Sequence, residues 1–195
     1  MAGRIKRKKT RKQDDTTTSK ARPFLIWGAV VVGIIALAAL LFLSMRGPTP
    51  IADLMNFYGQ ERGHDNTVIY ASDLPPVGGL HSEVWQNCGI YDEPIDAANA
   101  VHSMEHGAVW ITYQPDLPQE EIATLQNLGR NENYLLLSPY PNLKSPVVLS
   151  AWGVQLEVDT VNDKRIKEFI KQYQQGPTTP ERGASCRDGV GSPLQ

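Results

Sequence analysis

The longest apolar stretch of the chain runs from Phe24 to Met45 and contains no charged residue in 22 positions. Arg22 and Arg46 stand just outside its two ends, and Trp27 lies near one of them, where an interfacial aromatic residue is expected. A helix needs about 20 apolar residues to cross a bilayer core, whereas the apolar region of a cleaved signal peptide is only about 7–15 residues long. The pattern therefore predicts an uncleaved, single-pass transmembrane helix over residues 24–45.

Beyond residue 50 the apolar positions recur at the spacings of short strands and amphipathic helices. Strands are predicted over Thr67–Ala71, Ala108–Tyr113, Tyr134–Leu137 and Val147–Val158, the last of them bent at Gly153. Helices are predicted over Pro94–His106, Pro118–Leu128 and Asp163–Tyr173, with Gly107 and Gly129 as stops after the first two. The last helix is amphipathic and directs four apolar side chains inward: Ile166, Phe169, Ile170 and Tyr173.

This order of elements predicts an α+β domain with an α/β-like character, in which helices cover a mixed sheet. The last six elements follow the order of a thioredoxin-like fold without its redox CxxC pair, and a ferredoxin-like arrangement is the alternative. By length the part outside the membrane is one domain. The predicted organisation is a basic tail (1–23), a transmembrane helix (24–45), a short stiff linker (46–55) and an extracytoplasmic domain (56–195).

The charge distribution predicts the orientation of the transmembrane helix. Nine of the 19 Lys and Arg residues lie in residues 1–22, together with only two acids, Asp14 and Asp15. The positive-inside tendency places this tail in the cytoplasm and the following domain across the cell membrane. Because the basic run has no aromatic residue and no accompanying fold, we expect it to contact anionic lipid and not nucleic acid. After Arg46 the chain carries nine bases against 19 acids, so the outer domain favours cations.

Two cysteines, Cys88 and Cys186, are far apart in the sequence, and neither belongs to a CxxC pair. In an oxidising extracytoplasmic compartment a lone pair of cysteines usually forms a disulfide. Such a bond would attach the Gly-, Pro- and Ser-rich C-terminal segment to the domain. Two free thiols, or one cysteine acting as a metal ligand, are the alternatives.

The segment Val101–Gly107 concentrates the ligand chemistry of the chain. If it is helical, His102, Glu105 and His106 project from one face, since they stand three and four residues apart. His81, at the end of a proline–glycine loop, is the most plausible third histidine, and His64 lies in another loop. Three imidazoles with a carboxylate suit zinc or Cu(II). We therefore predict a metal site at His81, His102, His106 and Glu105.

Met104 affects which metal the site would prefer, and the helix end offers an explanation of the histidines without a metal. A thioether ligand would shift the preference of the site toward copper, but Met104 points to another face of an ideal helix and is better explained as a core residue. The alternative for His102 and His106 is a hydrogen-bonded pair without metal, because a helix C-terminus favours protonated histidine.

Three functions remain open from these residues. The first is a non-catalytic metal-binding module, the second an accessory subunit of a larger membrane protein complex, and the third a metal-dependent hydrolase in which Glu105 activates a metal-bound water. The string His102-x-x-Glu105-His106 matches the HxxEH pattern of inverzincin peptidases, but Gly107 ends the helix at once, where those enzymes have a long helix. Because no nucleophile elbow, phosphate loop or dinucleotide fingerprint is present, we favour a role without catalysis and assign no catalytic residue.

Several spaced motifs resemble an uncharacterised, membrane-anchored bacterial family of unknown function, marked by PPxxGxH, W, GxY and VHxxEHG. The matching residues are Pro75-Pro76-Val77-Gly78-Gly79-Leu80-His81, Trp85, Gly89, Tyr91 and Val101–Gly107. Later matches are Pro139-Tyr140-Pro141, Ala151-Trp152-Gly153 and Pro180-Glu181 with Cys186. The chain departs from the pattern at Val77-Gly78, where the family usually carries a small polar residue. The resemblance implies membrane anchoring and supplies no reaction.

Overall fold

The computed structural model describes residues 21–44, 47, 49–70 and 72–194, so the basic tail before residue 21 lies outside the described part. The chain divides into two units, Met1–Thr49 and Pro50–Gln195. The first contains helix α1 (Ala21–Ser44), and its segment Ile26–Ser44 has a mean hydropathy of 2.8. This helix is long and apolar enough to cross a membrane, as a membrane anchor or a signal sequence would be.

The second unit is built on one mixed sheet of six strands in the order β1-β6-β5-β3-β4-β2. The strands are β1 (Met55–Asn56), β2 (Gly89–Ile90), β3 (Val109–Tyr113), β4 (Leu135–Pro139), β5 (Val147–Ala151) and β6 (Val154–Val158). Strand β4 is parallel to both β2 and β3, whereas β5 is antiparallel to both β3 and β6. The α+β class is thereby confirmed. The order β4-β3-β5-β6 is that of a thioredoxin-like sheet and not of a ferredoxin-like one.

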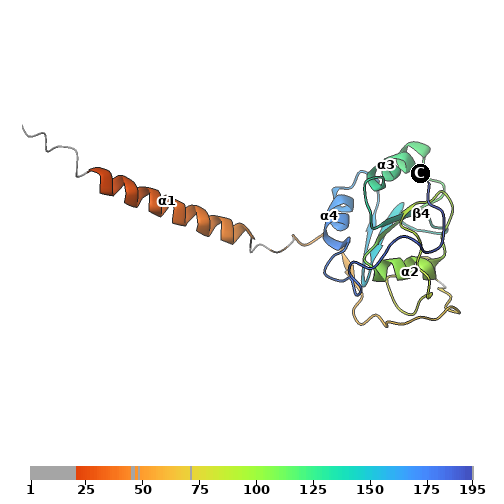
Figure 1. Cartoon of the computed structure of the whole chain (residues 1–195). Helices are drawn as coiled ribbons and strands as arrows, with labels where there is room; N and C mark the ends of the chain where they lie inside the picture. Colours follow the sequence, from red (N-terminus) through yellow and green to blue (C-terminus); the bar gives the residue numbers. More distant parts are fainter. Residues whose placement is uncertain (1–20, 45–46, 48, 71, 195) are drawn as a thin grey trace, which may run out of the picture. The chain divides into compact units, whose positions relative to one another are not determined.

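Helices cover both faces of this sheet (Figure 1). Helices α3 (Gln119–Gly129) and α4 (Lys164–Tyr173) pack on one face, and α2 (Ala97–Glu105) packs on the other. Neighbouring residues of a strand point to opposite faces, so Val109 and Ile111 join the core with α3 and α4, while Trp110 joins the core with α2. All positions of β3, β4 and β5 are buried, as expected for strands covered on both faces.

The inward face predicted for the last helix is confirmed. Ile166, Phe169, Ile170 and Tyr173 are all buried in the larger core cluster. The helix begins after Asp163, whose carboxylate accepts a hydrogen bond from the amide of Arg165 at 2.8 Å. This cap satisfies one of the amide donors that the first helical turn leaves free.

The strand predicted at Thr67–Ala71 is wrong for the residues that the structure describes. Residues 67–70 form no strand, and Ile69 is 87% exposed. The cause is local, because Asp65 accepts hydrogen bonds from the amide and the hydroxyl of Thr67 and turns the chain. A β-branched and aromatic run is thus held in a loop by the polar residue that precedes it.

Three other boundaries differ from the sequence prediction. The segment Val147–Val158 is not one bent strand but the hairpin β5–β6, which turns at Gly153 with a φ of 72°. Helix α2 begins at Ala97 and not at Pro94, because Asp96 caps it. Ile51, within the segment assigned to the linker, is buried in the core. The two-residue strands β1 and β2 were not predicted, since they are too short for a periodic pattern.

Candidate metal centre

All four histidines of the chain lie together beside α2, although they come from three separate segments. The ring of His64 lies 5.0 Å from that of His81 and 4.9 Å from that of His102, measured between centroids. The rings of His81 and His102 are 5.0 Å apart, and His106 continues the cluster at 4.6 Å from His102. The sequence brings no two of these segments together, so tertiary packing creates the cluster.

Four residues of this region offer ligand atoms that all lie within 4.8 Å of one another: His64, His81, His102 and Glu105. We call these four residues the ligand group. It contains His81, His102 and Glu105 of the predicted site and adds His64 in place of His106. Three imidazole nitrogens and one carboxylate oxygen form a donor set that suits a single zinc or Cu(II) ion.

Helix α2 positions two members of the ligand group. Its N-cap is Asp96, whose carboxylate accepts hydrogen bonds from the amides of Ala98 at 2.8 Å and Asn99 at 3.1 Å. The three-residue spacing of His102 and Glu105 then places both side chains on one face. Gly107 ends the helix with a φ of 104°, a conformation that favours glycine.

Backbone pairing between two loops positions the other two members. His64 and His81 form an isolated parallel β-bridge. The amide of His81 donates to the carbonyl of Gly63 at 3.1 Å, and the amide of Asp65 donates to the carbonyl of His81 at 2.7 Å. These two hydrogen bonds hold the loop that carries His64 against the loop that carries His81.

Three of the histidines donate Nδ1–H to a backbone carbonyl. His81 donates to Gly79 at 2.8 Å and His102 donates to Ser82 at 2.7 Å. His106 donates to Ser185 at 2.6 Å. A carbonyl can only accept, so the hydrogen-bond network assigns the proton to Nδ1 and leaves Nε2 available as a ligand atom. Histidines that bind a metal through one ring nitrogen typically donate the other ring N–H to a carbonyl or carboxylate in this way.

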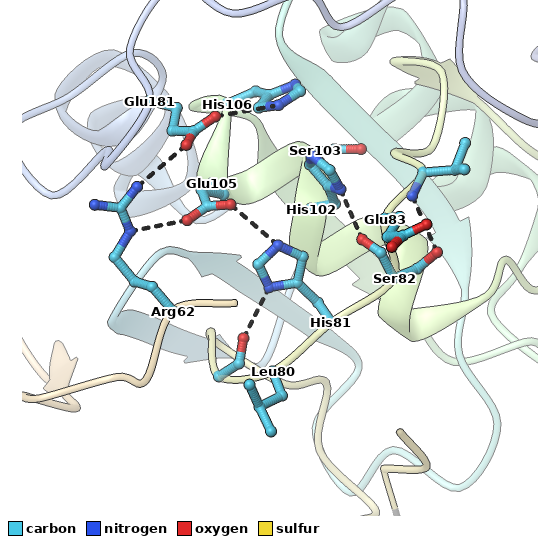
Figure 2. A network of polar contacts seen from close by, with 12 residues as sticks. Arg62, Leu80, His81, Ser82, Glu83, His102, Ser103, Glu105, His106 and Glu181 are labelled. Carbon is cyan, nitrogen blue, oxygen red and sulfur yellow. Dashed lines mark hydrogen bonds and ion pairs between the residues drawn. The ribbon is translucent and has the colours of Figure 1, made fainter. Parts of the chain in front are cut away.

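The carboxylate of Glu105 is buried and has a different neighbour at each oxygen (Figure 2). Oε1 accepts a hydrogen bond from Nε of Arg62 at 2.9 Å, and Oε2 lies 3.0 Å from Nε2 of His81. The second contact is close but not aligned as a hydrogen bond, so the fully buried Nε2 of His81 has no hydrogen-bond partner among the described residues. An unpartnered nitrogen beside a carboxylate oxygen is a pair of atoms that a cation would satisfy.

Arg62 and Glu181 extend the network beyond the ligand group. Nη2 of Arg62 donates to Oε1 of Glu181 at 3.2 Å, and Oε2 of Glu181 lies 3.8 Å from Nε2 of His106 (Figure 2). His106 therefore faces the C-terminal segment, which supplies both Glu181 and the carbonyl of Ser185. Sequence reasoning did not connect Arg62 or Glu181 with Glu105, because the three residues lie far apart in the sequence and tertiary packing brings them together.

Burial is the largest influence on the His102 imidazole and lowers its pKa. The neighbouring histidines His106, His81 and His64 lower that pKa further, whereas the hydrogen bond to Ser82 opposes the shift. A lowered pKa keeps His102 neutral near pH 7, and the neutral imidazole is the form that binds a metal.

A disulfide joins Cys88 to Cys186, with the two Cα atoms 5.3 Å apart. It fixes the C-terminal segment next to the site, because Cys186 directly follows Ser185. The amide of Cys88 donates to the carbonyl of Cys186 at 2.8 Å, and the indole of Trp85 donates to the carbonyl of Arg187 at 3.0 Å. The pairing expected from the redox compartment is the one that the structure contains.

Fold and site together define a class of protein: an α+β domain, preceded by an apolar helix, that gathers histidines and a carboxylate over one face of its sheet. The chain belongs to the family described as "Protein of unknown function (DUF3105)", which it matches over residues 62–188. That range contains every residue of the ligand group. No curated protein and no solved structure matches the chain.

Proposed function

We propose that residues 50–195 form a metal-binding module that takes up one zinc or Cu(II) ion through the ligand group. The observation that carries the proposal is the buried Nε2 of His81, which lies 3.0 Å from the Glu105 carboxylate without a hydrogen bond. His102 supports it with an Nε2 left free by the bond from Nδ1 to Ser82. The acidic balance of the domain also favours a cation.

The sulfur atoms near the site are not available as ligands, and this favours a divalent ion over Cu(I). Met104 is completely buried and packs with Val101 and Trp110 in the core on the α2 side of the sheet. Cys88 and Cys186 are bonded to each other and offer no thiolate. Cu(I) prefers soft sulfur ligands, whereas nitrogen and carboxylate ligands suit zinc and Cu(II). The ligand group contains no sulfur atom.

The position of Glu105 favours binding over hydrolysis. A hydrolase of the type considered above would need Glu105 as a base that is free to take a proton from a metal-bound water. Here the carboxylate is itself a member of the ligand group and is also ion-paired to Arg62. We therefore assign Glu105 as a ligand and propose no catalytic residue.

We also propose that α1 anchors this module outside the cell membrane. Its apolar segment and the basic residues that precede it support a single pass with the N-terminus in the cytoplasm. The full chain should then remain in the membrane pellet after an alkaline carbonate wash. Release into the supernatant, or a mature protein that lacks residues 1–44, would show that the helix is not an anchor.

Glu105→Gln is expected to weaken zinc binding by at least about 10–100-fold, because changing even an outer partner of a metal ligand typically costs that much and here the charge of a ligand itself is lost. The substitution keeps the size of the side chain and removes the charge that an ion would meet beside His81. The measurement is a competition titration of purified residues 50–195 against a chromophoric chelator.

Glu120→Gln is the matched control for this titration. Glu120 is exposed in the first turn of α3, away from the ligand group, so its variant should bind one equivalent of zinc as the unmodified domain does. Equal affinity of the Glu105→Gln and Glu120→Gln variants would contradict the assignment of Glu105 as a ligand. A domain that binds no zinc or copper at all would refute the proposed function.

A further inference from the structure

We propose that His64 is the exchangeable ligand of this centre, through which the ion passes between the domain and an external nitrogen or carboxylate ligand. The inference rests on the proposed function and adds to it the ligand at which the ion is exchanged. The observation behind it is that one exposed, unanchored histidine lies against three buried ligands.

The first argument is the difference in burial within the ligand group. The side chain of His81 is fully buried, Glu105 is 3% exposed and His102 is 5% exposed. His64 is the one exposed member of the group. An external ligand can therefore approach the centre from the side of His64, whereas the other three donors lie beneath the surface.

The second argument is the difference in anchoring. His81 and His102 are each fixed by a hydrogen bond from Nδ1 to a backbone carbonyl. Among the described residues, the His64 ring makes no hydrogen bond and no ion pair, and its contacts are with the rings of His81 and His102. His64 can therefore rotate away without leaving an unsatisfied buried group. Rotation of His81 or His102 would instead break a hydrogen bond and leave a carbonyl without its partner.

The third argument is the way in which the His64 ring meets the buried donors. It stacks on the ring of His102 at 4.9 Å with an interplanar angle of 20°, and it meets His81 edge-on. Its backbone is held by the bridge to His81, and Gly63 precedes it with a φ of 147°. The backbone is thus fixed near the centre while the side chain remains free, which is the arrangement that a displaceable ligand requires.

Exchange at this position is a ligand substitution. The bond from the ion to the imidazole of His64 breaks as a bond to the incoming nitrogen or carboxylate oxygen forms, and the imidazole leaves as a neutral group. His81, His102 and Glu105 keep the ion during this step, and its oxidation state does not change. The fitting partner is a molecule or protein that presents an accessible imidazole, amine or carboxylate. A fully closed structural zinc site, with four fixed ligands, would not behave in this way.

The test compares zinc transfer from the full-length chain in detergent with transfer from its His64→Ala variant, using an excess of a chromophoric chelator in a stopped-flow experiment. We expect the variant to bind zinc and to release it at least about ten times faster, because losing even a hydrogen-bond partner of a ligand commonly weakens metal affinity by about that factor. Added free imidazole should slow the release again, because it can occupy the exposed position that His64 leaves. Ile69→Ala, a change at an exposed residue of the loop that follows His64, is the control and should release zinc at the unmodified rate.

His102→Ala provides the opposite case, because free imidazole should not rescue the loss of a buried ligand. Release from His64→Ala at the unmodified rate would overturn the inference, as would a complete loss of zinc binding in His64→Ala that imidazole does not restore. In both cases an unmodified chain that retains zinc would leave the proposed function standing. An unmodified chain that retains no zinc would overturn the proposed function and this inference together.

Discussion

Replacing His81 and His102 together by alanine is expected to weaken zinc binding by at least about 100-fold, because changing even an outer partner of a metal ligand typically costs about 10-fold or more and this variant loses two ligands. Both side chains are buried, and each has its Nδ1 bonded to a carbonyl and its Nε2 available. The two remaining members, His64 and Glu105, cannot hold an ion tightly, because zinc sites in proteins ordinarily use three or four protein ligands. The measurement is a competition titration against chelators of graded affinity.

His106→Ala is the matched control for this double variant. His106 belongs to the same histidine cluster, but it faces Ser185 and Glu181 and stands outside the ligand group. Its variant should bind zinc within about tenfold of the unmodified domain, because the loss of a direct hydrogen-bond partner of a ligand costs about tenfold or more and the His106 side chain is not such a partner. A loss with His106→Ala as large as with the double variant would restore the original prediction from the sequence. Circular dichroism of the metal-free variants separates lost ligands from a lost fold.

Replacing Cys88 and Cys186 together by serine should lower the free energy of unfolding by about 2–4 kcal/mol, the typical contribution of a disulfide that closes a long loop. The bond joins residues 98 positions apart and holds the C-terminal segment beside the histidine cluster. Denaturant unfolding under oxidising conditions measures the loss. The double variant should still bind one equivalent of zinc, because neither sulfur belongs to the ligand group.

A reducing agent supplies the internal control for this prediction. Dithiothreitol should destabilise the unmodified domain by a similar amount and leave the Cys88→Ser, Cys186→Ser variant unchanged. An unmodified domain that is insensitive to reduction would show that the disulfide does not contribute to stability. Loss of zinc from the serine variant with its fold intact would instead support a cysteine ligand.

The parts of the fold that sequence reasoning predicted well are those with strong local signals. Helix α4 repeats apolar residues at helical spacing behind an aspartate cap, and all four of its predicted inward residues are buried. The central strand β3 is an apolar run that directly follows a helix stop. The failure at residues 67–70 has a local cause, the turn that Asp65 makes with Thr67, whereas the missed strands are decided by non-local contacts. Strands β1 and β2 have two residues each, and their pairing partners lie far away in the sequence.

The residues of the candidate site likewise fall into those that local sequence patterns indicated and one that tertiary structure decided. The turn of α2 indicated His102 and Glu105 because residues three apart share a helical face, and the rigid proline–glycine loop indicated His81. The choice of the remaining histidine depended on tertiary structure. His106 is the C-cap of α2 and turns toward Ser185, whereas the bridge between two loops brings His64 to His81. No local pattern contains that pairing.

The most direct test of the proposed metal centre is the X-ray absorption spectrum of residues 50–195 loaded with one equivalent of zinc. The ligand group predicts a first coordination shell of nitrogen and oxygen only, at about 2.0–2.2 Å, with the scattering pattern of three imidazoles. Substituting His64 should reduce that pattern to two imidazoles, and substituting His106 should leave it at three. A shell that contains sulfur at about 2.3 Å, or one that holds at most one imidazole, would contradict the assignment.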